Sequence, residues 1–81
     1  MDDSVVQDHI EELVAEERRL YDAAGREGGQ TIEERARLEE IRVSLDRYWD
    51  LLRQRRAQEE FGLNPDDVSM RSADTVEHFK Q

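Results

Sequence analysis

The sequence predicts an all-α protein, an antiparallel two-helix hairpin of coiled-coil-like character that is followed by a short, partly helical C-terminal tail. Apolar residues recur at alternating steps of three and four in two long segments, which is the spacing of packed helices. The chain's only cluster of glycines separates the segments, and Asn64-Pro65 stops the second one. We therefore expect a hairpin over residues 1–62 and a tail over residues 63–81.

The first helix is expected over about residues 4–24. Asp3 or Ser4 can cap it, because their side-chain oxygens accept hydrogen bonds from the first turn. A carboxylate, Glu17, interrupts the apolar seam, and we expect it to bond an arginine of the second helix such as Arg35. The other seam residues are Val6, Ile10, Leu13, Leu20 and Ala24.

The glycine-rich residues 25–30 form the expected turn, and the second helix is expected over about residues 31–61. It opens with Thr31 and Glu34, the spacing of a capping box in which each side chain bonds the other residue's backbone N–H. Gly62 is the expected C-terminal cap. The apolar seam of this helix consists of Leu38, Ile41, Leu45, Tyr48 and Leu52.

The two seams can be docked on each other about the glycine turn. With the turn centred between residues 27 and 28, Ile10 lies opposite Leu45 and Val6 lies opposite Trp49. The acidic start of the first helix then lies near the arginines of residues 53–56, so charge and apolar pattern favour the same register.

The tail carries weaker signals. Asn64 can cap a short turn that begins at Pro65. Ser72 or Asp74 can cap another short helix that runs through Val76 and Phe79.

The composition excludes several classes of function. The net charge is −9, from 21 acidic and 12 basic side chains, so the surface repels nucleic-acid phosphates and anionic lipid. The absence of cysteine excludes disulfides, zinc–thiolate sites and thiol nucleophiles. No apolar run is long enough to span a membrane and no signal-peptide pattern is present, so we expect a cytoplasmic protein without membrane contact.

One group of side chains resembles a metal-binding pattern. His9, Glu12 and Glu16 share a helix face, but di-iron bundles use a Glu-x-x-His unit, and neither long helix contains one. A hairpin also has no cleft in which carboxylates are desolvated for acid–base chemistry. We therefore expect no enzyme activity, no metal and no cofactor.

The second helix carries more apolar residues than one partner helix covers, since Val43, Trp49 and Leu51 lie off its seam. Either the tail or a second copy of the chain covers this surplus, and a second copy gives a homodimeric four-helix bundle. The leading hypothesis is a non-catalytic protein–protein interaction module. The alternative is a small regulator that contacts a nucleic-acid machine, polymerase or ribosome, through the arginines of residues 53–56. The candidate interface comprises Val43, Trp49, Leu51, Arg53, Arg55, Arg56 and Phe61.

Residues 45–68 carry a specific pattern: Leu45-Asp46, then Trp49-Asp50-Leu51-Leu52-Arg53-Gln54-Arg55-Arg56-Ala57, Glu60-Phe61-Gly62 and Asn64-Pro65-Asp66. With it the chain resembles the domain-of-unknown-function 2630 family, short proteins of high-GC Gram-positive bacteria. The resemblance covers nearly the whole chain and departs at Ser72, where the family pattern implies a proline. It implies a lineage and no activity.

Overall fold

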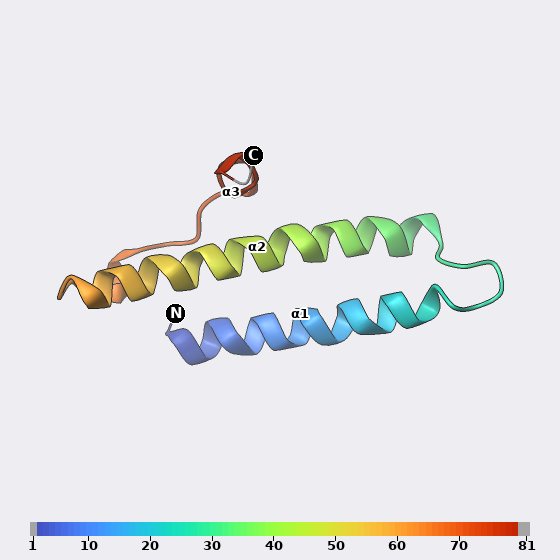
Figure 1. The fold of residues 1–81 in the computed structure, drawn as a ribbon, viewed down its shortest axis with the longest axis horizontal. Coiled ribbons are helices and arrows are strands. Elements are labelled where there is room, and N and C mark those ends of the chain that lie inside the picture. The colour runs from blue at the N-terminus through green and yellow to red at the C-terminus, as the bar shows by residue number, and fades with distance from the viewer. Residues whose placement is uncertain (1, 80–81) are drawn as a thin grey trace.

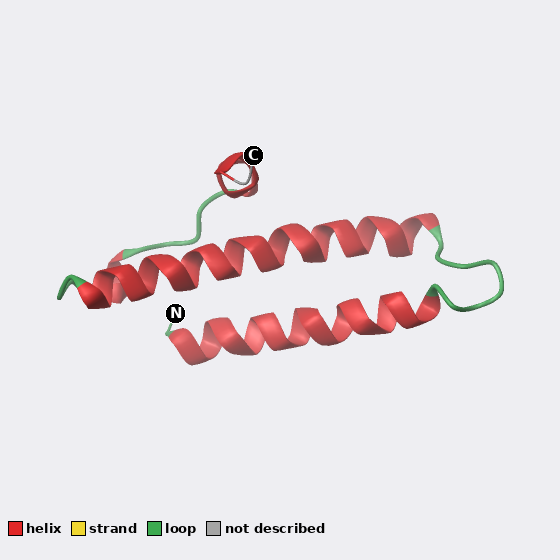
Figure 2. Cartoon of the chain, in the orientation of Figure 1, coloured by secondary structure: helices red, strands yellow, loops and turns green. Residues whose placement is uncertain are grey.

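The structure is a computed structural model that describes residues 2–79. Two long helices form an antiparallel hairpin, and the tail returns along the outer side of the second helix (Figures 1 and 2). No strand occurs in this part of the chain, which confirms the all-α class. Residues 1, 80 and 81, which the expected hairpin and tail included, lie outside the described residues. The elements are α1 (Asp3–Ala23), α2 (Ile32–Glu60), the 3-10 helix η1 (Pro65–Asp67) and α3 (Ala73–Phe79).

Helix α1 begins slightly earlier than expected, because its cap is Asp2 rather than Asp3 or Ser4. The Asp2 Oδ1 atom accepts hydrogen bonds from the Val5 N–H at 3.0 Å and the Ser4 hydroxyl at 2.8 Å. Asp3 instead lies inside the first turn, where its carboxylate forms an ion pair with Arg55 of α2. The acidic start of the chain therefore both caps α1 and joins it to the second helix.

The turn and the start of α2 follow the expected pattern. Gly28 and Gly29 have φ of 88° and 68°, the left-handed region that glycine enters without strain. The Gln30 side-chain amide donates to the Leu20 carbonyl at 2.9 Å and so satisfies a free carbonyl at the end of α1. Thr31 and Glu34 form the predicted capping box, each bonding the other's backbone N–H at 3.0 Å.

Replacing Thr31 with alanine should lower the free energy of unfolding by about 1 kcal/mol, the usual effect of losing a helix cap. The change removes the oxygen that accepts from the Glu34 N–H. Urea denaturation followed by circular dichroism measures the effect, with Thr31→Ser as the matched control that keeps the oxygen. Equal midpoints for the alanine and serine variants would contradict this role of the cap.

The hairpin core lies towards the open end of the hairpin. Val6 and Ile10 pack there with Leu52, and Leu45 packs against the same cluster, as the predicted register requires. Trp49, the expected neighbour of Val6, is not part of this core. Three residues along an α-helix rotate the side chain by about 60° around the axis, so Leu52 points at α1 while Trp49 points aside.

The ion pair that links α1 and α2 differs from the predicted pair of Glu17 and Arg35. Arg37 donates from Nε and Nη2 to the two carboxylate oxygens of Glu16, at 2.6 and 2.8 Å. Arg35 is exposed. The prediction was wrong because it placed the carboxylate within the seam, whereas the salt bridge forms at the flank of the seam, where long side chains reach across the contact while staying partly in water.

The end of α2 sends the chain back along the helix. Gly62 has φ of 72°, its N–H donates to the Glu59 carbonyl, and the Leu63 N–H donates to Gln58, the bonding pattern of a Schellman motif. Both η1 and α3 then pack against α2. Ser72 is the cap of α3, since its hydroxyl accepts from the Thr75 N–H at 3.2 Å. Val76 of α3 is buried, so the tail is a packed part of the fold.

Candidate protein interface

Helix α2 presents three faces to its surroundings, because each residue turns the side chain by about 100° around the axis. One face packs on α1, and a second lies under η1 and α3. The third face points outward. Its exposed residues, which we call the exposed stripe, are Arg42, Trp49, Arg53, Arg56 and Glu60.

The residues of the predicted interface differ widely in exposure. Trp49 is 47% exposed and Phe61, just past the end of α2, is 79% exposed. The exposed residues of the predicted interface are Trp49, Arg53, Arg56 and Phe61. Val43 is half-buried, and Leu51 and Arg55 are buried. The candidate surface is therefore smaller than the sequence indicated.

Leu51 is buried in the structure. Only 5% of it is exposed, because it belongs to the hairpin core and Val68 of the tail packs against the same cluster. The sequence left open whether the tail or a second copy of the chain covers the apolar surplus of the second helix. At Leu51 the tail is the cover. Leu51 therefore stabilises the contact between α2 and the tail.

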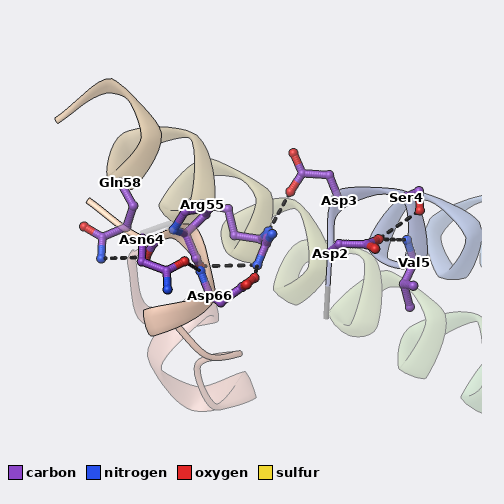
Figure 3. A network of polar contacts seen from close by, with 9 residues as sticks. Asp2, Asp3, Ser4, Val5, Arg55, Gln58, Asn64 and Asp66 are labelled. Atoms are coloured by element: carbon purple, nitrogen blue, oxygen red, sulfur yellow. Dashed lines mark hydrogen bonds and ion pairs between the residues drawn. The ribbon is translucent and has the colours of Figure 1, made fainter. Parts of the chain in front are cut away.

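Arg55 is buried as well. It is 5% exposed and reaches between two carboxylates, donating from Nε to Asp3 at 2.6 Å and from Nη1 to Asp66 at 2.9 Å (Figure 3). A further bond from Nη1 reaches the Pro65 carbonyl at 3.2 Å. The hydrogen bond to Asp3, supported by the one to Asp66, raises the pKa of Arg55. Arg55 thus ties together the start of α1, the end of α2 and the tail.

Because Arg55 is buried, the arginine patch of residues 53–56 has only Arg53 and Arg56 at the surface. Arg53 remains largely exposed, with Asp50 3.8 Å away, and Arg56 is exposed. Two arginines on a surface of net charge −9 form a small basic site, and nucleic-acid binding usually requires a much larger one.

An open pocket of about 260 Å³ lies beside Arg55, where the tail crosses α2. Two carboxylates already hold the buried guanidinium there, so the pocket offers no net positive charge to a phosphate or carboxylate ligand. Its lining residues are Tyr48, Leu51, Arg55, Asp66, Val68, Ser69 and Met70.

The His9 region forms a second, more polar hollow of about 220 Å³ between α1 and α2. The His9 ring stacks on Tyr48, with ring centroids 5.4 Å apart and an interplanar angle of 14°. Its Nδ1 lies 4.0 Å from Glu12, while Glu16 is held by Arg37. The sequence did not indicate the contact with Tyr48, since the two rings belong to different helices. Within residues 2–79, no three histidine or acidic side chains are grouped closely enough to hold a metal ion.

The Glu16–Arg37 pair predicts a specific dependence on pH. The hydrogen bond from Arg37 lowers the pKa of Glu16 below the ordinary value of 4.5, so the pair stabilises the fold above that pH and loses its effect as the pH falls further. The difference in thermal midpoint between wild type and Glu16→Gln should therefore be present at neutral pH and shrink below pH 4.5. A difference that is independent of pH would show that the pair does not stabilise the hairpin.

No helix among the described residues is long and apolar enough to cross a lipid bilayer. The sequence profile of the family described as "Protein of unknown function (DUF2630)" matches residues 2–81. The chain belongs to this family. Membership of the DUF2630 family confirms the resemblance that residues 45–68 carry, and the family has no assigned activity.

Proteins similar to this chain occur in mycobacteria. The chain is 43% identical over 77 residues to the uncharacterized protein Rv0898c of Mycobacterium tuberculosis, a match that covers 95% of this chain and 88% of the relative. The same values hold for the uncharacterized protein Mb0922c of Mycobacterium bovis. No solved structure shows significant similarity to the chain. Any functional argument for this DUF2630 protein therefore rests on its own surface.

Proposed function

We propose that this chain is a non-catalytic protein–protein interaction module that binds its partner through the exposed stripe of α2, with Trp49 at the centre. The observation that supports this is the exposure of Trp49, which is 47% in a chain with a single tryptophan. Both other faces of α2 are covered by the chain itself. Fully burying a large apolar side chain contributes about 1.5–3 kcal/mol of free energy. A partner that covers the outward-facing tryptophan would gain part of this free energy for binding.

The neighbours of Trp49 suit the same role. Arg53 and Arg56 lie one and two turns further along the stripe and are exposed. Tryptophan and arginine are the residues most enriched among those that dominate binding energy at protein interfaces. A surface of this composition supports binding rather than catalysis.

The alternative, a regulator at a nucleic-acid machine, now has less support. Arg55 is committed to Asp3 and Asp66, and the surrounding charge of −9 opposes direct contact with phosphates. Contact with a protein subunit of such a machine would still use the exposed stripe.

Photo-crosslinking in the native cell tests the proposal. A benzoyl-phenylalanine replaces Trp49 in one variant and Tyr21 in the control, since Tyr21 is also an exposed aromatic residue but lies near the turn. We expect a protein adduct from position 49 that is absent from position 21. No adduct at position 49, or the same adducts from both positions, would overturn the proposed function.

A further inference from the structure

The exposed stripe has an uneven distribution of charge along α2. At its start, Arg42 is surrounded by three carboxylates, with Glu39 at 2.7 Å, Asp46 at 3.1 Å and Glu77 of α3 also bound. This end is therefore acidic on balance. Beyond Trp49 the stripe becomes basic at Arg53 and Arg56, and Glu60 ends it. A partner that matches this surface must be basic, then aromatic, then acidic in the same direction.

We infer that this partner is a second copy of the chain, docked with the two α2 helices antiparallel. The inference rests on the proposed function and names the partner of the same surface. With the two-fold axis beside position 51, Trp49 lies opposite Arg53 of the second copy. Asp46 then lies opposite Arg56 of that copy, and Arg42 lies opposite its Glu60. The contacts at Trp49 and at Asp46 are complementary, and the symmetry repeats both of them.

Other arrangements of the same helices are less favourable. A parallel pair places arginine against arginine at positions 53 and 56. An antiparallel pair with Trp49 opposite Trp49 loses the pairing of Asp46 with Arg56. Like charges in contact across an interface are unfavourable, so the charge pattern selects the antiparallel register about position 51.

The spacing of the stripe allows two helices to stay in contact along it. With the half-buried Asp46 added to the five exposed residues of the stripe, the positions 42, 46, 49, 53, 56 and 60 follow alternating steps of four and three, the repeat that keeps one helix face against a partner. Within the stripe, Arg42 binds Glu77 of the tail and the other four residues are exposed, so docking requires no opening of the hairpin. The Trp49 indole contacts the Arg53 guanidinium of the other copy, an attraction between a cation and an aromatic face.

The overall charge weakens this association without preventing it. Each copy carries a net charge of −9, but repulsion between distant charges is screened beyond roughly 8–10 Å at physiological salt. The contacts within the stripe are shorter than this. We therefore expect a concentration-dependent dimer rather than a permanent one.

Two charge-reversal variants test the inference by sedimentation velocity. Arg56→Glu places two acidic side chains opposite each other, and Asp46→Arg places two arginines together, so each variant alone should raise the dimer Kd by about tenfold or more. In a mixed dimer, the introduced arginine of one variant faces the introduced glutamate of the other, and the native pair is restored at the opposite end. The mixture should therefore associate more tightly than either variant alone. Arg18→Glu, which makes the same charge change as Arg56→Glu on an exposed site of α1, should leave the Kd unchanged.

Circular dichroism of both variants establishes that the helices are intact. A wild-type chain that stays monomeric up to about 1 mM overturns the inference, as does a mixture that associates no better than its parts. If the chain does not self-associate, the proposed function can still hold, because a crosslink from position 49 to a different protein would support it.

A spin label measures the register directly, because the chain contains no native cysteine. Position 57, changed by Ala57→Cys, is exposed and lies six positions from the proposed axis. In the antiparallel register the two labels are separated by about 18 Å along the helices, from a rise of about 1.5 Å per residue. A separation near 10 Å, the distance between helices packed side by side in parallel, would overturn the register.

Discussion

Replacing Leu52 with alanine should leave most of the chain unfolded at room temperature. Leu52 is 1% exposed and lies in the core with Val6 and Ile10. Removing a buried leucine side chain costs about 2–5 kcal/mol, because the loss of burial adds to the cost of the cavity. A chain of this size rarely has more than about 3–5 kcal/mol of stability in total, so the loss is comparable to the whole.

Far-UV circular dichroism with urea denaturation measures this effect. Leu63→Ala is the matched control, since Leu63 is 56% exposed and its truncation should change the stability by only about 0.5 kcal/mol. If the two variants had the same midpoint, the core would not lie between α1 and α2 at this position.

Replacing Arg55 with alanine should release the tail and loosen the start of α1 together. Asp3 and Asp66 then lose the cation that both of them bind, and the Pro65 carbonyl loses a donor (Figure 3). We expect a decrease in thermal midpoint several times larger than that of Arg53→Ala, because Arg53 is exposed and has only a distant contact with Asp50.

Hydrogen exchange locates the change that this substitution causes. The amides of η1 and of the segment before α3 should exchange faster in Arg55→Ala than in Arg53→Ala, together with those of the first turn of α1. Arg55→Lys should behave like alanine, because an ammonium group cannot direct separate N–H groups at both carboxylates. Unchanged exchange in the tail would show that Arg55 does not fasten it.

The sequence predicted the hairpin because its signals are local or periodic. The seams of Ile10 and Leu45 align without adjustment about the glycine turn, and the Thr31 capping box needs only four consecutive residues. The same holds for Gly62 and for the cap at Ser72. Patterns of this kind are complete within one or two turns of helix, so they do not depend on how the rest of the chain packs.

Which residues of the candidate interface are buried was harder to predict, because their burial depends on contacts between residues far apart in the sequence. Arg53, Arg55 and Arg56 are equivalent in composition, yet only Arg55 faces both Asp3 and Asp66. Its burial depends on the direction that the chain takes after Gly62. Leu51 is buried for the same reason, since Val68 reaches it only when the tail turns back along α2.

Quenching of the Trp49 fluorescence by acrylamide measures whether this side chain faces outward from a folded chain until a second copy covers it, because Trp49 is the only tryptophan. In dilute protein we expect quenching between that of free indole and that of a buried tryptophan. The quenching should fall as the protein concentration rises and remain high in Arg56→Glu. A tryptophan that is already protected in dilute monomer, or one whose quenching does not change as the protein is concentrated, would contradict the account.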